Sequence, residues 1–235
     1  MKASRQRVVE PELLDVLPPA DERALKSRLD LRLLNQCMKH PQLMSRALLE
    51  NLDGIKAPKI VEFGAGDGDF LLSVARRLEN KMPDAEAILV DRLDSFDPKI
   101  RDEFKNLGWR LRTEIAEVFE WLRQSPPNGA DAIIANLFLH QFQANELAEM
   151  LRLAARSTKL FLALEPSRAW LPRFCGHFLW VIGCGPVTRH DAGISIRAGF
   201  LGREISAMWE DKDQWELTER PVGLFSHLFI ARRKE

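Results

Sequence analysis

Short apolar runs alternate with helix-length amphipathic segments between residues 59 and 165. The apolar runs have the length of buried strands, and the segments between them carry apolar residues at helical spacing. Strands separated by helices favour crossover units and a parallel sheet covered on both faces. The predicted strands are 59–63, 85–91, 109–115, 131–138 and 159–165, and the predicted helices are 69–80, 98–107, 116–124 and 145–156, the last with Asn145 as its N-cap and Glu146 in its first turn.

The two ends of the chain have different patterns. Residues 1–19 are polar and contain several prolines, which predicts an irregular arm. From residue 21 to residue 52, two amphipathic helices are predicted, which either cover the binding site or only pack against the sheet. Their apolar positions are Leu25, Leu29, Leu33 and Met38 in the first helix, and Leu43, Leu48 and Leu49 in the second. Residues 214–223 and 224–233 predict a hairpin at the sheet edge.

Charge and cysteine content exclude several classes of protein. Lys plus Arg and Asp plus Glu each number 34, so no positive field favours nucleic acid as a partner. The three cysteines lack the spacing of a metal site or a disulfide framework. The sequence has no signal-peptide pattern and no run of about 18 apolar residues. We therefore expect a cytoplasmic protein without a membrane span or a bound metal.

A glycine-rich turn follows the first predicted strand. In VEFGAGDGDF, residues 61–70, three glycines alternate with other residues: Gly64, Gly66 and Gly68. Glycine permits positive φ and close approach of a ligand to the backbone. The spacing is GxGxG rather than the GxGxxG of dinucleotide-binding turns. Glu62 precedes the turn, and its charge would repel a pyrophosphate but suits a ligand with an amino group and a sulfonium.

A second acidic residue, Asp91, ends the next predicted strand. It follows the last glycine by about 20 residues, where an acidic side chain binds the ribose hydroxyls in doubly wound nucleotide-binding sheets. With Glu62 and the strand–turn–helix context, this spacing favours a bound nucleoside derivative over a purely structural turn.

These motifs resemble those of the class I S-adenosylmethionine-dependent methyltransferases. VEFGAGDG resembles the first motif of that family, LVD at 89–91 its second, and DAIIANLFLHQF at 131–142 its fourth-strand segment. The resemblance covers residues 58–165, and the terminal hairpin resembles the sixth and seventh strands. It implies a Rossmann-like, doubly wound α/β fold with a seven-stranded sheet and an antiparallel last strand. The expected domains are an arm and helical cap at 1–57 and a cofactor-binding domain at 58–235.

The resemblance also implies a cofactor, S-adenosylmethionine, and the residues that bind it. Glu62 and the three glycines would line its methionine part. Asp91 would take the ribose hydroxyls, and Arg92 would lie along the adenine. Ala65 and Asn136 complete the expected cofactor-binding set. Many relatives also have an acidic residue at the adenine amino group, and the two candidates for it here are Glu114 and Glu117.

Two histidines are candidates for a general base. His140 follows the fourth predicted strand, where relatives often line the active site, although it could instead cap a helix or fill the rim. His190 precedes Asp191, and a nearby carboxylate orients an imidazole and makes it a stronger base. On a strand, however, adjacent side chains would point apart. Glu165 and Arg168 end the fifth predicted strand, where they could hold a polar substrate group or form a salt bridge.

The segment 169–209 lies where methyltransferases insert substrate-recognition elements. Its first half carries large aromatic residues, which predict a wall of an apolar acceptor cavity or, alternatively, core: Trp170, Phe174, Phe178 and Trp180. EPSR, VTRHDAGISIRAGFLGRE and GLFSHLF resemble stretches of methyltransferases associated with type III polyketide synthases. That resemblance implies phenolic or pyrone acceptors. We therefore expect a small hydrophobic acceptor, methylated on a phenolic or enolic oxygen.

Three other kinds of protein fit part of the pattern. A non-catalytic partner of a biosynthetic enzyme could bind S-adenosylmethionine without turnover. A dinucleotide-dependent oxidoreductase is disfavoured by the GxGxG spacing and by Glu62. Aminopropyltransferases carry a similar glycine loop but need an acidic polyamine pocket, which the sequence does not indicate. A methyltransferase is the favoured prediction, and the pattern does not set its oligomeric state.

Overall fold

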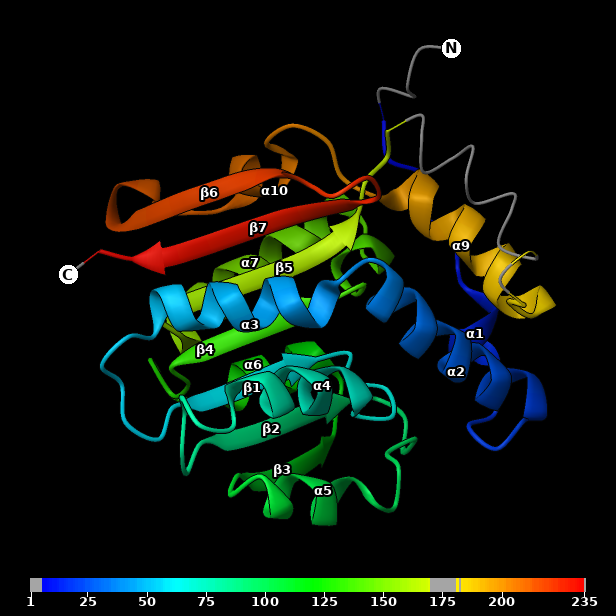
Figure 1. The fold of residues 1–235 in the computed structure, drawn as a ribbon. Helices are drawn as coiled ribbons and strands as arrows, with labels where there is room; N and C mark the ends of the chain where they lie inside the picture. The colour runs from blue at the N-terminus through cyan, green and yellow to red at the C-terminus, as the bar shows by residue number, and fades with distance from the viewer. Residues whose placement is uncertain (1–5, 170–180, 182, 235) are drawn as a thin grey trace.

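Seven strands form one sheet in the order β3-β2-β1-β4-β5-β7-β6 (Figure 1). In this computed structural model, which describes residues 6–169, 181 and 183–234, β1 to β5 pair in parallel. β7 pairs antiparallel with both β5 and β6, which confirms the predicted hairpin at the edge. The strands are β1 Lys59–Phe63, β2 Glu86–Asp91, β3 Arg110–Ile115, β4 Ala132–Asn136, β5 Leu160–Pro166, β6 Trp215–Val222 and β7 Ser226–Arg233.

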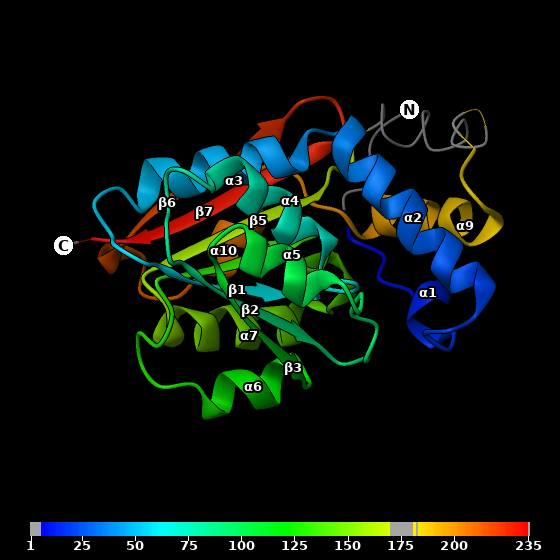
Figure 2. The same ribbon diagram turned by 60° about the horizontal axis from the view of Figure 1, so that its bottom comes forward.

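Helices cover both faces of the sheet, as predicted (Figure 2). One face packs against α3 (His40–Asn51), α4 (Asp69–Leu78) and α5 (Ile100–Asn106). The other packs against α6 (Val118–Gln124), α7 (Ala144–Ser157) and α10 (Glu204–Met208). Strands β1, β2, β4 and β5 are buried on both faces, which explains their continuous apolar runs, whereas β3 at the edge of the sheet stays largely exposed. The fold is therefore the Rossmann-like class I methyltransferase fold with N-terminal helices.

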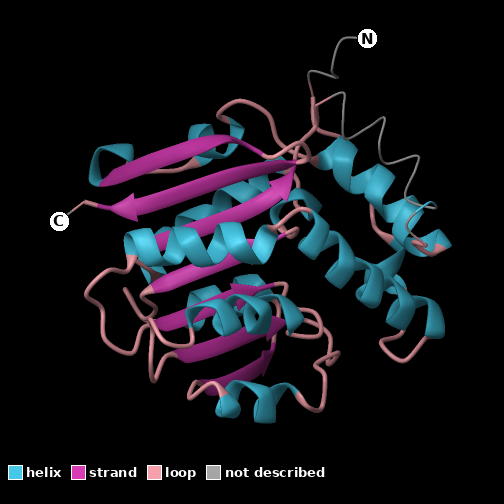
Figure 3. Ribbon diagram, viewed as in Figure 1, coloured by secondary structure: helices cyan, strands magenta, loops and turns pink. Residues whose placement is uncertain are grey.

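Three further helices lie beyond the carboxyl ends of the parallel strands (Figure 3). They are α1 (Leu13–Val16), α2 (Glu22–Cys37) and α9 (Pro186–Ala198). Asp30 joins α2 to α9, since its buried carboxylate accepts hydrogen bonds from the Gly185 amide at 2.7 Å and from the Thr188 hydroxyl at 2.8 Å. These contacts hold the two helices together as one cap. Two short 3₁₀ turns, Leu139–Gln141 and Lys212–Gln214, complete the described elements.

The first N-terminal helix does not bury its leucines. Leu25, Leu29 and Leu33 of α2 are 50%, 57% and 43% exposed. The face that α2 buries carries Ala24, Ser27 and Asp30 instead, and the two polar residues hydrogen-bond to α9. The predicted apolar face of this helix is therefore wrong, because small and polar side chains make its close contact.

The second N-terminal helix, α3, behaves as its pattern predicts. Met44 and Leu48 are fully buried, and Leu43 and Leu49 pack at the edge of the same apolar cluster. That cluster also contains residues of β1, β4 and β5. Thus α3 is part of the core of the sheet domain rather than of the cap.

Two local predictions need correction. Helix α7 begins after Gln143, not Asn145, and the Gln143 amide donates to the Glu146 carboxylate at 3.0 Å. The segment that contains His190 is helical, because it lies within α9.

The aromatic residues expected to form a cavity wall, at 170–180, lie outside the described residues. No helix of the described ranges has both the length and the apolar character that a bilayer span requires.

Candidate active site

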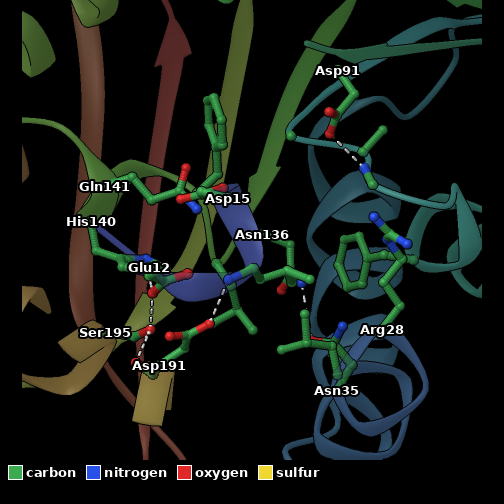
Figure 4. Close-up of a pocket in the computed structure, with 18 of the residues that line it drawn as sticks. Glu12, Asp15, Arg28, Asn35, Asp91, Asn136, His140, Gln141, Asp191 and Ser195 are labelled. Carbon is green, nitrogen blue, oxygen red and sulfur yellow. Dashed lines mark hydrogen bonds and ion pairs between the residues drawn. The ribbon is translucent and has the colours of Figure 1, made fainter. Parts of the chain in front are cut away.

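A cavity of about 720 Å³ lies past the carboxyl ends of β1, β2, β4 and β5. This volume is within the range of small-molecule sites. Its position beside the β1–β4 pair is where the strand order reverses, and open α/β sheets bind ligands at that point. Figure 4 shows Asp91 on one side of the cavity, His140, Glu12 and Ser195 on the other, and Asn136 between them.

The glycine turn forms part of the cavity wall. Gly64, Gly66 and Gly68 all have positive φ, at 65°, 56° and 84°. A Cβ on Gly64 would lie 2.3 Å from Cδ2 of Phe138, whereas one on Gly66 would meet no atom of the described residues within 4 Å. Gly66 lines the cavity and Gly68 does not. Gly68 instead precedes α4 as its N-cap, so its contribution is to the turn.

Asp91 holds the glycine turn to the next loop. One carboxylate oxygen accepts the Gly66 amide at 2.8 Å, and the other accepts the Leu93 amide at 2.9 Å. Each oxygen keeps a lone pair for a further donor. Asp91 lies at the carboxyl tip of β2, as predicted, and lines the cavity.

The residues after β2 and β3 extend this side of the cavity. Arg92 lines it and donates to the backbone carbonyl of Asp15 at 2.6 Å. Of the two candidates for an adenine contact, Glu117 lines the cavity, at the start of α6. Glu114 is not among the lining residues and pairs with Arg112.

Glu62 carries a buried carboxylate beside the glycine turn. The residue is 2% exposed, and its Oε2 has no hydrogen-bond partner within the described part of the chain. Burial, followed by the nearby Asp67 and Asp91, raises the pKa of Glu62 well above its usual value, against the effect of the Leu71 amide. Glu62 lines the cavity. A cationic group is the ligand chemistry that such a site favours, and the amino group or sulfonium of S-adenosylmethionine fits it.

Asn136 is fixed by residues that the sequence did not indicate. Its amide donates to Asn35 of α2 at 3.0 Å, and its oxygen lies 2.7 Å from Nδ1 of His40. The other nitrogen of His40 lies 2.6 Å from the Ser226 hydroxyl. Burial lowers the pKa of His40 to about 4, so the ring is neutral and serves as a hydrogen-bonding link. Ala65, next in the glycine turn, also lines the cavity.

His140 lies in the 3₁₀ turn after β4, between two carboxylates. Its Nδ1 is 2.8 Å from Glu165 Oε2, and its Nε2 is 3.1 Å from Glu12 Oε1. Burial of the ring disfavours the charged form, but the hydrogen bonds and attraction to Glu12 and Glu165 outweigh it and raise the pKa of His140 to about 10. His140 lines the cavity, so an acceptor could reach this ionised group.

Glu165 anchors the turn that carries His140. One of its oxygens accepts the amides of Phe138 and Leu139, at 3.0 and 2.8 Å. Arg168 pairs instead with Glu204, at 2.6 Å. Neither Glu165 nor Arg168 lines the cavity, so they are not the charged pair for a substrate that their sequence positions allowed.

His190 lies outside the cavity. Its side chain is 51% exposed, and its Nδ1 is 2.9 Å from Asp191 Oδ1. Asp191 itself lines the cavity, where its two oxygens accept the amides of Leu13 and Leu14. The structure therefore brings His140 to the same cavity that the glycine turn, Glu62 and Asp91 line, and leaves His190 on the outer face of α9.

Comparisons with known proteins identify the fold. No protein-family model and no curated protein matches the sequence. Among solved structures, an O-methyltransferase family protein from Burkholderia thailandensis shares 19% identity, with a TM-score of 0.59 over 92% of this chain and 61% of that one. The plantazolicin methyltransferase BamL, in complex with a triazolic desmethylPZN analog and SAH, shares 9% identity, with a TM-score of 0.64 over 94% and 93% of the two chains.

A third structure, a SAM-dependent methyltransferase from Aquifex aeolicus, shares 14% identity, with a TM-score of 0.54 over 81% of this chain and 89% of that one. This chain spans about 61% of the length of the O-methyltransferase structures from Burkholderia and from Nostoc punctiforme. At such identities the similarity concerns the fold, which is that of S-adenosylmethionine-dependent methyltransferases.

Proposed function

We propose that this chain is an S-adenosylmethionine-dependent methyltransferase that acts on a small hydrophobic acceptor. The observation that supports the proposal best is a single cavity with two chemically different sides. One side carries the glycine turn with Glu62 and Asp91, and the other carries His140 between two carboxylates. The first side suits a cationic nucleoside derivative, and the second can hold or accept a proton.

Each residue on the cofactor side would contact a different part of S-adenosylmethionine. Glu62 would pair with its positive charge, because the buried carboxylate has an oxygen without a partner in the described part of the chain. Asp91 would accept the ribose hydroxyls, and Glu117 is the acidic residue available to the adenine amino group. Arg92 would lie beside the base. When bound, the cofactor supplies an activated methyl group.

The acceptor side supports a hydroxyl-bearing substrate. Apolar side chains line much of the cavity, among them Leu31, Leu34, Phe138, Phe142 and Ile196. Such walls favour a hydrophobic ring. A phenolic or enolic hydroxyl must lose its proton as its oxygen is methylated. His140 would take that proton at Nε2 after it has released its own proton from that atom, while Glu165 holds Nδ1. The resemblance to methyltransferases associated with type III polyketide synthases gives phenols and pyrones as the first acceptors to test.

Methyl transfer from labelled S-adenosylmethionine to a panel of phenols and pyrones tests this proposal. We expect labelled product from the wild-type chain. His140→Gln should lower kcat by about 10²- to 10⁴-fold, the usual contribution of a general base. His190→Gln, on the exposed side of α9, is the matched control and should keep the wild-type rate. Cofactor binding without transfer to any acceptor would favour the non-catalytic alternative.

A further inference from the structure

The N-terminal arm, residues 6–20, is docked along α9 and closes the acceptor side of the cavity. In Figure 1 the arm and α1 run beside α9 and α2. Asp191 caps α1 from outside, because it accepts the Leu13 and Leu14 amides at 2.9 and 3.0 Å. Further contacts join the arm to the end of α9: Val8 N to Arg197 O at 3.2 Å, Arg7 Nε to Ala198 O at 2.7 Å, and Glu10 with Arg197 at 2.6 Å.

This docking places the carboxylate of Glu12 on His140. Glu12 Oε1 lies 3.1 Å from His140 Nε2 and also accepts a hydrogen bond from the Ser195 hydroxyl of α9. The Glu12 side chain is 12% exposed and lines the cavity. Burial alone would favour its neutral form, but the hydrogen bond and attraction to His140 outweigh burial and lower the pKa of Glu12. Glu12 and His140 therefore form a buried ion pair between segments 128 residues apart.

Glu12 is bound to the ring nitrogen of His140 that an acceptor hydroxyl would need, which is Nε2. Nδ1 of His140 is committed to Glu165, which is fully buried and is held by backbone amides. Nε2 is thus the ring nitrogen available on the cavity side, and Glu12 is bound to it. A ring that bears a proton at Nε2 cannot accept another there.

We propose that Glu12 is a positioning residue that occupies the acceptor's place at His140 Nε2, so that His140 becomes a base only when Glu12 withdraws. This proposal rests on the proposed function of the same cavity. When Glu12 withdraws, one proton leaves Nε2 to solvent, and the neutral ring keeps its proton at Nδ1 on Glu165. Nε2 then accepts one proton from the acceptor hydroxyl. The arm thereby links the protonation of His140 to occupation of the acceptor side.

The charged groups around His140 come from three segments. Glu165 is on β5, Glu12 and Asp15 are on the arm and α1, and Asp191 is on α9. Arg7 of the arm donates to the backbone carbonyl of His140 at 3.1 Å. Of the carboxylates, Glu12 and Glu165 contact the ring directly. Removal of the Glu12 charge alone should therefore lower the pH at which His140 titrates, while Glu165 keeps the ring in place.

Glu12→Gln tests the proposal in the full-length, ligand-free chain. The titration of His140 is followed by NMR of the imidazole, and His140→Gln identifies its signal among the five histidines. We expect the midpoint to fall by about one to three pH units, the usual effect of losing one adjacent charge. Glu22→Gln, which removes an exposed carboxylate of α2 that neither docks the arm nor lines the cavity, should leave the midpoint unchanged. An unchanged midpoint in folded Glu12→Gln would overturn the proposal.

A second variant covers the case in which Glu12→Gln does not fold. Asp191→Asn weakens the cap of α1 and loosens the arm without altering Glu12, and it should lower the same midpoint. With an active acceptor, Glu12→Gln should also move the acidic limb of kcat/KM to lower pH and lower the acceptor KM several-fold. If Glu12 had only a structural role, the acidic limb of the kcat/KM profile would stay at its wild-type pH. Because the NMR titration needs neither cofactor nor acceptor, its outcome is independent of whether the chain proves to be a methyltransferase.

Discussion

Gly66 shows how a single residue can be required by both the backbone and the ligand. Its φ of 56° is unfavourable for residues with a side chain, and the space in front of its missing Cβ belongs to the cavity. Gly54 has a similar backbone, with a φ of 79° and no atom of the described residues within 4 Å of an added Cβ, but it does not line the cavity. A comparison of the two glycines therefore distinguishes the effect of backbone strain, which both share, from the effect of ligand contact, which only Gly66 could make.

Gly66→Ala and Gly54→Ala should each reduce the free energy of unfolding by about 1–2 kcal/mol, because both force alanine into the left-handed region. We expect only Gly66→Ala to weaken the binding of S-adenosylhomocysteine, by more than tenfold, since its methyl group would enter the cavity. Chemical denaturation and calorimetry measure the two effects. Equal affinity in both variants would mean that no ligand approaches this turn.

The sequence could predict that Glu62, Gly66 and Asp91 lie close together beside one cavity, because their signals are local. Glu62, Gly66 and Asp91 all belong to strand ends whose spacing along the chain is diagnostic. Glu12 and His40 could not be predicted in the same way. Each meets its partner through the tertiary fold, across about a hundred residues of chain, and neither lies in a motif that indicates the contact.

Among the helices, α2 and α3 both have an amphipathic pattern with several leucines, but the leucines of α3 pack into the core and Leu25, Leu29 and Leu33 of α2 are exposed. The apolar pattern of α3 identifies its core face, because that helix lies on the sheet. The pattern of α2 does not, because α2 lies against α9, and its contacts include the hydrogen bonds of Ser27 and Asp30. Periodicity indicates a helix in both cases, but the partner decides which face is buried.

Two leucine substitutions test this difference. Leu48→Ala in α3 should reduce the free energy of unfolding by about 2–5 kcal/mol, because it leaves a cavity in the core. Leu29→Ala in α2 removes a side chain that is 57% exposed and should change stability by less than about 0.5 kcal/mol. Urea denaturation of both variants checks the prediction. A large loss in Leu29→Ala would show that the exposed side of α2 has a partner.

At the scale of the whole molecule, the sequence predicts the sheet well, but it does not predict which segments close the cavity. Alternating strands and helices predict the doubly wound sheet, and the terminal hairpin supplies the antiparallel edge. The cavity, however, is closed by three segments from opposite ends of the chain: the arm, α2 and α9. Their meeting depends on Asp30 and Asp191, whose roles emerge only from the packing of distant helices.

Calorimetric titration with S-adenosylhomocysteine determines whether the cavity binds a cofactor of this class. We predict micromolar binding to the wild-type chain and at least a tenfold loss in Asp91→Asn, because an amide cannot replace both acceptor oxygens that hold the Gly66 turn and face the cavity. Asp94→Asn makes the same charge change at an exposed position that does not line the cavity and should bind as the wild type does. A folded wild-type chain that binds no S-adenosylhomocysteine would refute the assignment of this cavity to S-adenosylmethionine.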